Sequence, residues 1–239
     1  MKKLFTAIFI MANFLTYAQS TTVVISQVYG GGGSGTATYQ SDYVELHNIS
    51  AVTQDISGFK IMYGSAAGNL GSTATNVFTF PASITIPAGG YVLIASAPSS
   101  GLAPLPITPD YTFTLGLSGT NGKVALGTAA MVSNATVLAQ PAGAIIDLVG
   151  YGSANDFEGT AVVALSGTTA AFRKNNGCTE TNNNTSDFTT GTPVPRNASS
   201  TAFNCSGGGT IPNLVTGTLT SFGNQALNIH TASQTIAVS

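Results

Sequence analysis

The chain has 239 residues, of which seven are basic and nine acidic. Charged residues make up only 7% of the sequence, against about 25% in a typical soluble domain. The 28 glycines and 10 prolines disfavour helix interiors. This composition excludes a coiled coil, a helical bundle and a basic nucleic-acid-binding protein. The 43% hydrophobic content argues against a disordered chain.

Residues 1–18 have the three parts of a secretory signal peptide. Lys2 and Lys3 form its basic start, Leu4–Leu15 is apolar, and a small-residue cleavage site ends at Ala18. The apolar part is shorter than the roughly 20 residues that a membrane-spanning helix needs. We therefore expect a secreted, extracellular protein, free or attached to the cell surface, with no membrane span.

Cleavage after Ala18 would remove two lysines and no acid, so the formal charge would change from −2 to −4. A domain of this charge has no positive field for phosphates or anionic lipid, so we do not expect nucleic acid as a partner. Cys178 and Cys205 lie beyond the signal, in a compartment where disulfides persist, and two cysteines allow one intrachain pairing. A metal site is the weaker alternative, because two distant thiols supply too few ligands.

Short β-forming runs separated by glycine- and proline-rich turns follow the signal, with almost no helical periodicity. Asp42–Asn48 alternates polar and apolar residues, which is typical of a strand with one buried face. Ile84–Ala95 is typical of two short strands around a Pro/Gly turn. This pattern predicts an all-β antiparallel sandwich or barrel. The other expected strands are Val23–Tyr29, Phe59–Tyr63, Asn76–Phe80, Tyr111–Leu115, Lys123–Leu126, Ile145–Tyr151 and Ala170–Arg173.

Motifs spread along the chain carry a resemblance to a known family. They are Val23–Gly33, Asp42–Asn48, Asp55–Phe59, Ile146–Gly152, Phe157–Gly159, Arg173–Lys174, Cys178–Asn184, Asp187–Gly191 and Pro195–Asn197. In this order they resemble the bacterial lamin tail domain, in the version found at the N-terminus of secreted multidomain proteins, including extracellular nucleases. The resemblance implies an immunoglobulin-like antiparallel β-sandwich with no catalytic residues in this module.

The sequence departs from the family pattern at two positions. Phe59 stands where lamin tail domains commonly carry Trp, so a buried ring is kept without the indole donor. Asp156 stands where we expect relatives often to carry cysteine. The usual disulfide pattern is therefore altered, and a Cys178–Cys205 disulfide is our hypothesis for this chain.

The resemblance places the lamin tail domain at residues 20–204. Polar, Pro- and Gly-rich sequence begins at Gly191 and ends at Thr210, and residues 205–210 are the predicted linker. Residues 211–239 form a second β-rich segment, which resembles the first strands of an immunoglobulin-like repeat and is too short to close a core alone. We expect it to be the incomplete start of a second β module, which makes this chain the N-terminal part of a longer protein.

Acidic and Asn residues concentrate in two stretches of the second half of the domain. Calcium binds such side-chain oxygens without needing regular spacing, because loops can converge on the ion. The alternative is that these residues form turns by bonding to their own backbone. The candidate ligands of a weak calcium site are Asp156, Glu158, Glu180, Asn182, Asn184 and Asp187.

Two other patterns bear on phosphate binding and on acid/base catalysis. Gly30–Gly33 could cradle a phosphate only if it opened a helix, and no helical period follows, so a flexible inter-strand loop is predicted. Asp42 and Glu45 fall on opposite faces of their strand and cannot act as an acid/base pair. Glu45 shares its face with Tyr43 and His47, which predicts a polar network at the strand surface.

The remaining titratable residues give little support to catalysis. His47 and His230 are far apart in the sequence, which disfavours a metal centre or a Ser/His/Asp triad. Arg173, Lys174 and Arg196 are expected to pair with nearby acids.

The sequence thus predicts a non-catalytic, secreted, monomeric interaction module for a protein, polysaccharide or surface ligand. Ca²⁺ is the one cofactor that the residues suggest. The alternative is an accessory part of an extracellular endonuclease or phosphoesterase, whose catalytic domain would lie beyond residue 239.

Overall fold

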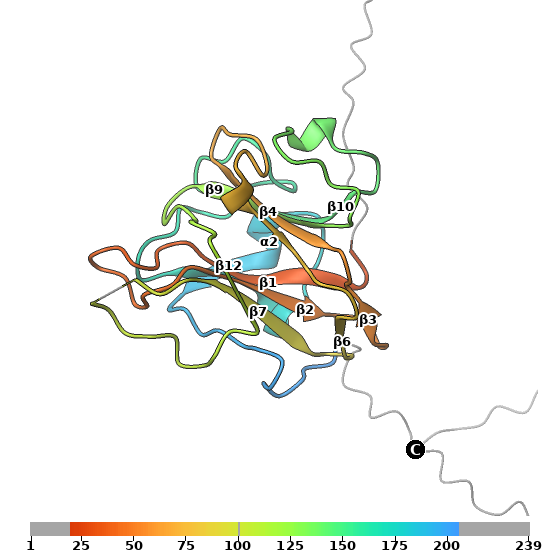
Figure 1. Ribbon diagram of the computed structural model, residues 1–239, viewed down its shortest axis with the longest axis horizontal. Coiled ribbons are helices and arrows are strands. Elements are labelled where there is room, and N and C mark those ends of the chain that lie inside the picture. Colours follow the sequence, from red (N-terminus) through yellow and green to blue (C-terminus); the bar gives the residue numbers. More distant parts are fainter. Residues whose placement is uncertain (1–19, 100, 206–239) are drawn as a thin grey trace, which may run out of the picture. The chain divides into compact units, whose positions relative to one another are not determined.

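The computed structural model describes residues 20–99 and 101–205, and Figure 1 shows how they fold. The predicted signal peptide, residues 206–210 of the predicted linker and the segment 211–239 lie outside the described residues. Across residues 20–99 and 101–205, we find no helix with the length and apolar character needed to cross a membrane.

The larger of two main sheets has six strands in the order β12–β11–β1–β2–β7–β8. Neighbouring strands are antiparallel, except that β8 runs parallel to β7. Strand β2 lies in the middle, and β8 and β12 form the edges. The strands are β1 (Val23–Tyr29), β2 (Tyr43–Asn48), β7 (Tyr91–Ser96), β8 (Tyr111–Phe113), β11 (Ala170–Arg173) and β12 (Phe188–Gly191).

The second sheet has four antiparallel strands in the order β10–β9–β4–β5. Strands β3 and β6 form a separate two-stranded pair. The bounds are β3 (Gln54–Asp55), β4 (Lys60–Ser65), β5 (Val77–Thr79), β6 (Thr85–Ile86), β9 (Gly122–Gly127) and β10 (Ile145–Tyr151). Four short helical elements complete the described fold: η1 (Ala74–Asn76), η2 (Val137–Ala139), α1 (Lys174–Gly177) and α2 (Asn184–Asp187).

The two main sheets pack face to face. Figure 1 shows β4, β9 and β10 in one layer and β1, β2, β7 and β12 in the other. Side chains from both layers form one apolar cluster, to which Ile25 and Leu46 contribute from one sheet and Ile61 and Val124 from the other. The partly buried Phe59 packs against this cluster. The predicted all-β immunoglobulin-like sandwich is confirmed.

The strands around the predicted Pro/Gly turn are both present but do not pair with each other. Strand β6 pairs with β3, whereas β7 pairs with β2 and β8. The turn at residues 87–90 therefore carries the chain from the small strand pair into the six-stranded sheet. Strands β3 and β12 were not predicted, because two polar residues and a Thr-rich run give weak strand signals.

The expectation that β2 has only one buried face is wrong, since all six of its residues are buried. Its alternation of polar and apolar residues is real, but the polar face is covered. Arg196 and Phe203 form hydrogen bonds with Glu45 and His47 on this face, and Val194 donates to Gln27 of the neighbouring strand β1.

The prediction of a flexible loop at Gly30–Gly33 is also wrong for its first residues. Gly30 and Gly31 are buried. A Cβ atom on Gly30 would lie 2.3 Å from the carbonyl oxygen of Ser118, and one on Gly31 would lie 2.5 Å from Gly167 Cα. These glycines let separate loops pack backbone to backbone, which explains their type without any phosphate.

Candidate binding surface and the polar networks behind it

Glu45, in the central strand β2, accepts hydrogen bonds from three other residues. Ser26 Oγ lies 2.6 Å from Oε1, and Gln27 Nε2 lies 3.2 Å from Oε2. Arg196 donates from its backbone N–H to Oε2 at 2.6 Å and from Nη2 to Oε1 at 2.7 Å. Burial raises the pKa of Glu45, and the Arg196 guanidinium opposes that effect. We call these residues the Glu45 network.

Arg196 is held by more than its ion pair. Its guanidinium lies over the ring of Tyr91, 4.0 Å from the ring centre, and Nη1 donates to the Tyr91 hydroxyl at 2.8 Å. The same nitrogen donates to the carbonyl oxygen of Asn176 at 3.2 Å. Nε donates to Glu45 Oε1 at 3.1 Å. Each guanidinium nitrogen therefore has a partner, and the side chain has little capacity for a ligand.

The polar network predicted around Glu45 is present, but it is buried and not at the surface. Tyr43, which shares the face, donates to Gln27 Oε1, and Gln27 Oε1 also accepts from the backbone N–H of Val194 at 3.1 Å. The sequence could not show that Val194 and Arg196 lie on this face, because alternation within one strand does not reveal what covers it.

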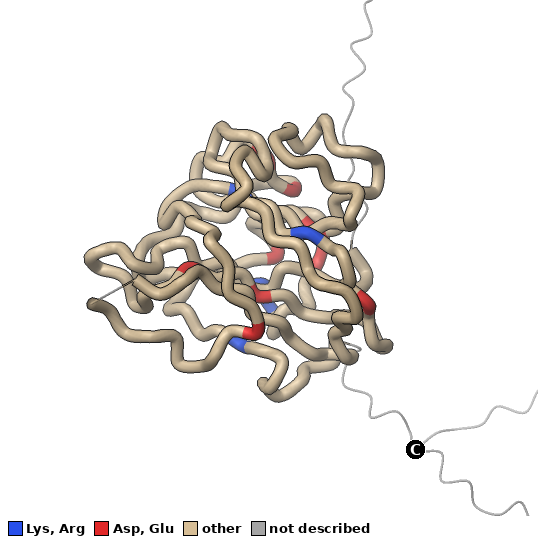
Figure 2. The backbone as a smooth tube through the Cα atoms, in the orientation of Figure 1, with Lys and Arg blue, Asp and Glu red and all other residues tan. Residues whose placement is uncertain are grey.

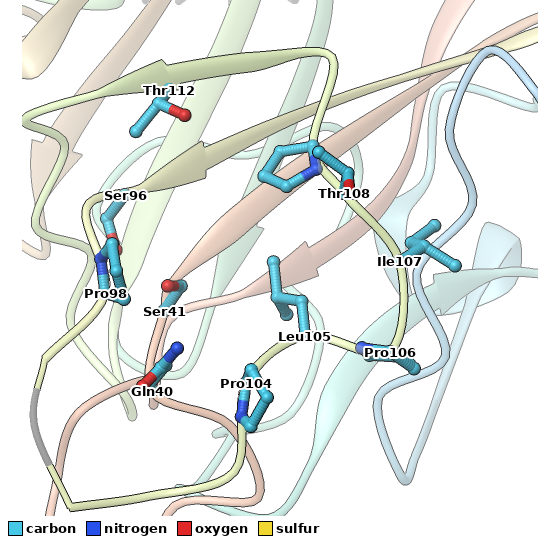
Figure 3. A pocket seen from close by; sticks show the side chains of 11 residues that line it. Gln40, Ser41, Ser96, Pro98, Pro104, Leu105, Pro106, Ile107, Thr108 and Thr112 are labelled. Atoms are coloured by element: carbon cyan, nitrogen blue, oxygen red, sulfur yellow. The ribbon is translucent and has the colours of Figure 1, made fainter.

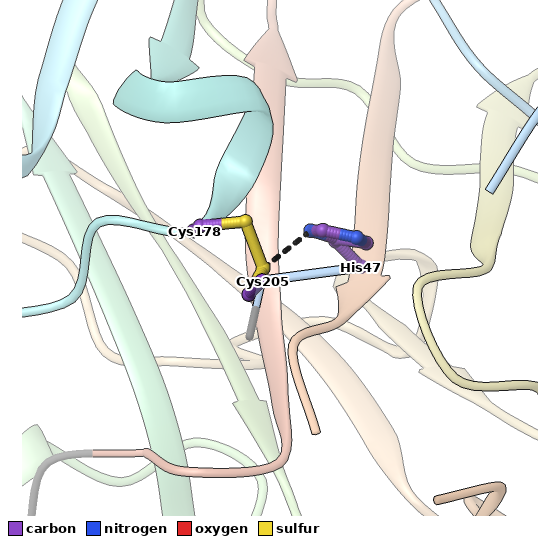
Figure 4. Close-up of side chains that lie close together, drawn as sticks. All are labelled: His47, Cys178 and Cys205. Carbon is purple, nitrogen blue, oxygen red and sulfur yellow. Dashed lines mark hydrogen bonds between the residues drawn. A yellow bond between two sulfur atoms is a disulfide. The ribbon is translucent and has the colours of Figure 1, made fainter. Parts of the chain in front are cut away.

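Cys178 and Cys205 form a disulfide, with their Cα atoms 5.3 Å apart. Figure 4 shows it beside His47, whose Nδ1 lies 4.0 Å from Cys205 Sγ. His47 Nε2 lies 2.9 Å from the carbonyl oxygen of Phe203, and its ring stacks on Tyr91. Burial lowers the pKa of His47, which favours the neutral ring. Because the two sulfurs are bonded to each other, they do not form a thiolate metal site with His47.

A second network surrounds Arg173 and consists of this residue with four buried acids, Asp147, Glu158, Glu180 and Asp187. We call it the Arg173 cluster. Arg173 Nη2 lies 2.6 Å from Asp147 Oδ2, and Nη1 pairs with Glu180 Oε2. Nη1 is 3.8 Å from Asp187 Oδ2. The cluster joins strands β10 and β11 to the loop that leads into β12.

The structure brings together two of the predicted calcium ligands with an acid that the prediction missed. One carboxylate oxygen each from Asp147, Glu158 and Glu180 lie within 4.8 Å of one another. Asp156 is engaged elsewhere, in an ion pair with Lys123 at 3.0 Å. Calcium binding by this group of acids stays a prediction.

The other predicted ligands have structural partners. Asp187 accepts from the Thr181 hydroxyl at 2.6 Å. Asn184 joins two segments, since its Oδ1 accepts from Gly150 N at 2.8 Å and its Nδ2 donates to Leu148 O at 2.8 Å. Asn182 differs, because its Oδ1 is buried and has no hydrogen-bond partner among the described residues.

Glu158 is the most perturbed acid of the cluster. Burial, together with the negative charges of Asp147 and Glu180, raises the pKa of Glu158 to about 9. Glu158 is therefore protonated at neutral pH when only protein groups surround it.

The turn α1 has an unusual backbone. Asn175, Asn176 and Gly177 have φ angles of 54°, 56° and 101°, all in the left-handed region. Asn tolerates this conformation better than other residues with a Cβ. A Cβ on Gly177 would lie 2.7 Å from His47 Nδ1. The turn leads directly into the disulfide at Cys178, which fixes its end.

A hollow of about 430 Å³ lies beside this turn and the edge strand β12. We call it the Asn hollow. Its lining residues are Phe172, Arg173, Lys174, Asn175, Asn176, Thr189, Val194 and Arg196. Among the described residues, no hydrogen bond engages the side-chain amides of Asn175 and Asn176.

The cations that line the Asn hollow are occupied by the protein itself. Arg173 and Arg196 pair with acids, as predicted. Lys174 does not: within the described chain its Nζ donates to the carbonyl oxygens of Thr185 and Ser186, the latter at 2.6 Å. The groups left for a ligand are amides, a hydroxyl and apolar surface.

A second hollow, of about 390 Å³, lies beside the opposite edge strand, β8. Figure 3 shows it between the loop before β2 and the proline-rich loop before β8. We call it the Pro hollow. It is lined by Gln40, Ser41, Ser96, Pro98, Pro104, Leu105, Pro106, Ile107, Thr108, Pro109 and Thr112, none of them charged. Figure 2 shows that most positions along the chain carry uncharged residues and that the acidic and basic positions are dispersed.

Comparison with known proteins identifies the family of the domain. The family model described as Lamin Tail Domain matches residues 16–153, which is more than half of the chain. The chain belongs to the lamin tail domain family. No curated protein matches it. The crystal structure of a DUF4876 family protein from Bacteroides thetaiotaomicron is similar in fold, with a TM-score of 0.53 and 15% identity over 78% of this chain and 76% of that one.

A lamin tail domain is a non-catalytic immunoglobulin-like domain. The match covers β1 to β10, whereas Arg173, Arg196 and both cysteines follow it in the sequence. In this lamin tail domain, the segment after residue 153 therefore supplies the basic partners of both buried networks and the whole Asn hollow.

The sequence did not predict the buried roles of Asp147 and Lys123 or the left-handed turn at Asn175 and Asn176. A signal for Asp147 existed, because an acid inside the apolar run of β10 must have a buried partner. The Lys-Asn-Asn-Gly run of α1 also has the residue types that favour left-handed turns.

Proposed function

We propose that this lamin tail domain is a non-catalytic, extracellular interaction module that binds a neutral oligosaccharide in the Asn hollow. The observation that carries the proposal is the chemistry left exposed there. Asn175 and Asn176 offer two amides, Thr189 offers a hydroxyl, and Phe172 offers a partly buried ring.

These groups suit a hydroxyl-rich ligand without charge. A side-chain amide donates and accepts at once, so it can bond two neighbouring hydroxyls of a sugar. An aromatic ring can pack against the apolar face of a sugar ring. Arg196 is paired with Glu45, and Lys174 donates to two backbone carbonyl oxygens, so neither cation is fully available to an anionic ligand.

The hollow is held in shape before a ligand arrives. The carbonyl oxygen of Asn176 accepts hydrogen bonds from Tyr91 and Arg196, and these bonds fix the left-handed turn. The disulfide at Cys178 fixes the end of the turn. A site fixed in advance loses less conformational entropy when it binds.

Two observations support the extracellular part of the proposal. The Cys178–Cys205 disulfide is compatible with an oxidising compartment. Lamin tail domains are also found in extracellular proteins. The alternative is an accessory role beside an extracellular endonuclease or phosphoesterase. In that case too, residues 20–205 would be a non-catalytic module, and this alternative stays a prediction.

A glycan array probed with the labelled full chain tests the proposal. The test variant is Asn175→Gly/Asn176→Gly, because glycine removes both amides yet accepts the left-handed backbone. Thr112→Ala in the Pro hollow is the matched control. We expect the wild type and the control to retain the same neutral glycans and the double variant to lose at least about tenfold in affinity, about 1.4 kcal/mol. Absence of glycan binding by the wild type, or unchanged binding by the double variant, would overturn the proposal.

A further inference from the structure

The Arg173 cluster contains more negative than positive charge. Four carboxyl groups and one guanidinium are buried together, and none of the five residues is more than 7% exposed. If all four acids ionise, three negative charges are in excess. An uncompensated buried charge is costly, so the cluster needs protons or a cation.

Arg173 has no further capacity to neutralise the acids. Its Nε donates to Ile25 O at 2.8 Å, and Nη1 donates to Thr179 O at 3.0 Å as well as to Glu180. Nη2 is engaged with Asp147 Oδ2. The remaining charge must therefore be met by something other than this side chain.

One oxygen of the cluster, in Asp147, lacks a hydrogen-bond donor and could therefore face the compensating charge. Asp147 has a fully buried side chain, and its Oδ1 has no hydrogen-bond partner among the described residues. Its other oxygen accepts from Ile25 N and Arg173. Asn182 Oδ1, on the loop that follows Glu180, is a second buried oxygen without such a partner. A buried acceptor without a donor is rare in native structures and calls for an explanation.

The distances between the acidic groups also suit a bound cation. Oxygens of Asp147, Glu158 and Glu180 lie within 4.8 Å of one another. Oxygen ligands about 2.4 Å from a calcium ion lie no further apart than this. We propose that Asp147, Glu158 and Glu180 bind one Ca²⁺ ion, with Asp147 Oδ1 as a ligand. The site would join strand β10 to the loops that contain Glu158 and Glu180.

The ligand chemistry favours calcium over other divalent ions. All three groups are carboxylates, which are hard ligands, and no described His or Cys belongs to the group. Mg²⁺ requires near-ideal octahedral geometry and usually keeps several waters, which a fully buried site disfavours. Each carboxylate oxygen has two lone pairs, so Glu180 can bind the ion while it accepts from Arg173 and Asn182.

Calcium titration of the EDTA-treated, purified full chain tests this proposal without any glycan, so its outcome is independent of the proposed function. We expect one bound Ca²⁺ per chain by calorimetry and by elemental analysis. We also expect a rise in Tm of about 5 °C at calcium well above Kd, and a smaller response to Mg²⁺.

Two acid-to-amide variants localise the site. Glu158→Gln should weaken calcium binding at least about tenfold, whereas Asp156→Asn, next to the cluster in sequence but paired with Lys123, should bind like the wild type. No bound calcium and no Tm change in the wild type would overturn the proposal and leave protons as the compensating charge. Equal loss in both variants would also overturn it. The wild-type titration decides even if Glu158→Gln fails to fold.

Discussion

Glu45 and Arg196 are 151 residues apart in the sequence, and Arg196 Nη2 lies 2.7 Å from Glu45 Oε1 in the structure. This contact joins the centre of the six-stranded sheet to the segment that follows its last strand. The few charges of the sequence are used in this way in both networks: Arg196 pairs with Glu45, and Arg173 pairs with Asp147 and Glu180.

Replacing Arg196 with Met should destabilise the domain by about 3 kcal/mol, because Glu45 would remain buried without its counter-charge. In the double variant Glu45→Gln/Arg196→Met the loss should be smaller than the sum of the two single losses. Urea unfolding of the four proteins measures this coupling. Additive losses would show that the ion pair does not stabilise the fold. Lys174→Met, which leaves no buried acid unpaired, serves as the control.

Asp42 gives the fold a pH dependence. Burial raises the pKa of Asp42 to about 7, although its oxygens accept from the backbone N–H groups of Gly32 and Leu117. The folded domain thus binds this proton more tightly than the unfolded chain, whose Asp pKa is about 3.9. The contribution of Asp42 to stability is full below about pH 4, falls as the pH rises toward 7, and is constant above that.

Unfolding of the wild type and of Asp42→Asn across this pH range isolates the effect, since asparagine does not titrate. The stability of the wild type relative to the variant should fall by up to about 4 kcal/mol between pH 4 and 7. A difference that stays constant would contradict the raised pKa.

Loss of the disulfide should weaken the domain and release its C-terminal segment. The two cysteines are 27 residues apart, and a loop of this size corresponds to about 3.5 kcal/mol of stabilisation in the chain-entropy account. Cys178→Ser/Cys205→Ser should show this loss, with faster amide exchange at Phe203, whose N–H donates to Gly89. Mass analysis with and without reductant checks the bond itself, and two free thiols in the oxidised chain would contradict the structure.

The glycine-rich loop allows a matched pair of substitutions. Gly30→Ala should destabilise the domain by about 3 kcal/mol, because the added Cβ would meet the Ser118 carbonyl oxygen at 2.3 Å. Gly35→Ala, where a Cβ would meet nothing within 4 Å, should be neutral within about 0.5 kcal/mol. Similar Tm values for the two variants would show that the loop is not closely packed.

The backbone of the Asn hollow can be tested by a similar comparison. Asn176→Ala should cost about 1 kcal/mol or more, since alanine is less tolerant of the left-handed region, whereas Asn176→Gly should cost less. Thermal unfolding of both variants gives the answer. Equal stability would mean that the left-handed turn is not maintained in solution.

Local patterns predicted much of this fold because they are properties of single strands. The Val/Ile-rich run of β1 and the alternation of β2 placed both strands, and alternation also placed Glu45 on one face with Tyr43 and His47. The burial of that face could not be predicted, because it depends on Arg196 and its neighbours folding back from a polar stretch that looks like a linker.

The candidate sites were also predicted only in part, because local sequence indicates some of their residues and tertiary contacts supply the others. Composition pointed to the loops at Glu158 and Glu180, but Asp147, which lies in a strand, completes the group only because β10 pairs beside those loops. The Asn hollow depends on a turn, an edge strand and a C-terminal segment that are brought together by tertiary contacts alone.

A neutral oligosaccharide bound at the Asn hollow should change the amide chemical shifts of the residues that line it. Amide chemical-shift mapping of the full chain with a glycan retained on the array tests it most directly. We predict that the largest shifts lie at residues 172–176, 189 and 194–196, and that Asn175→Gly/Asn176→Gly abolishes them. Shifts confined to the Pro hollow, or no shifts at saturating glycan, would show that the Asn hollow does not bind the glycan.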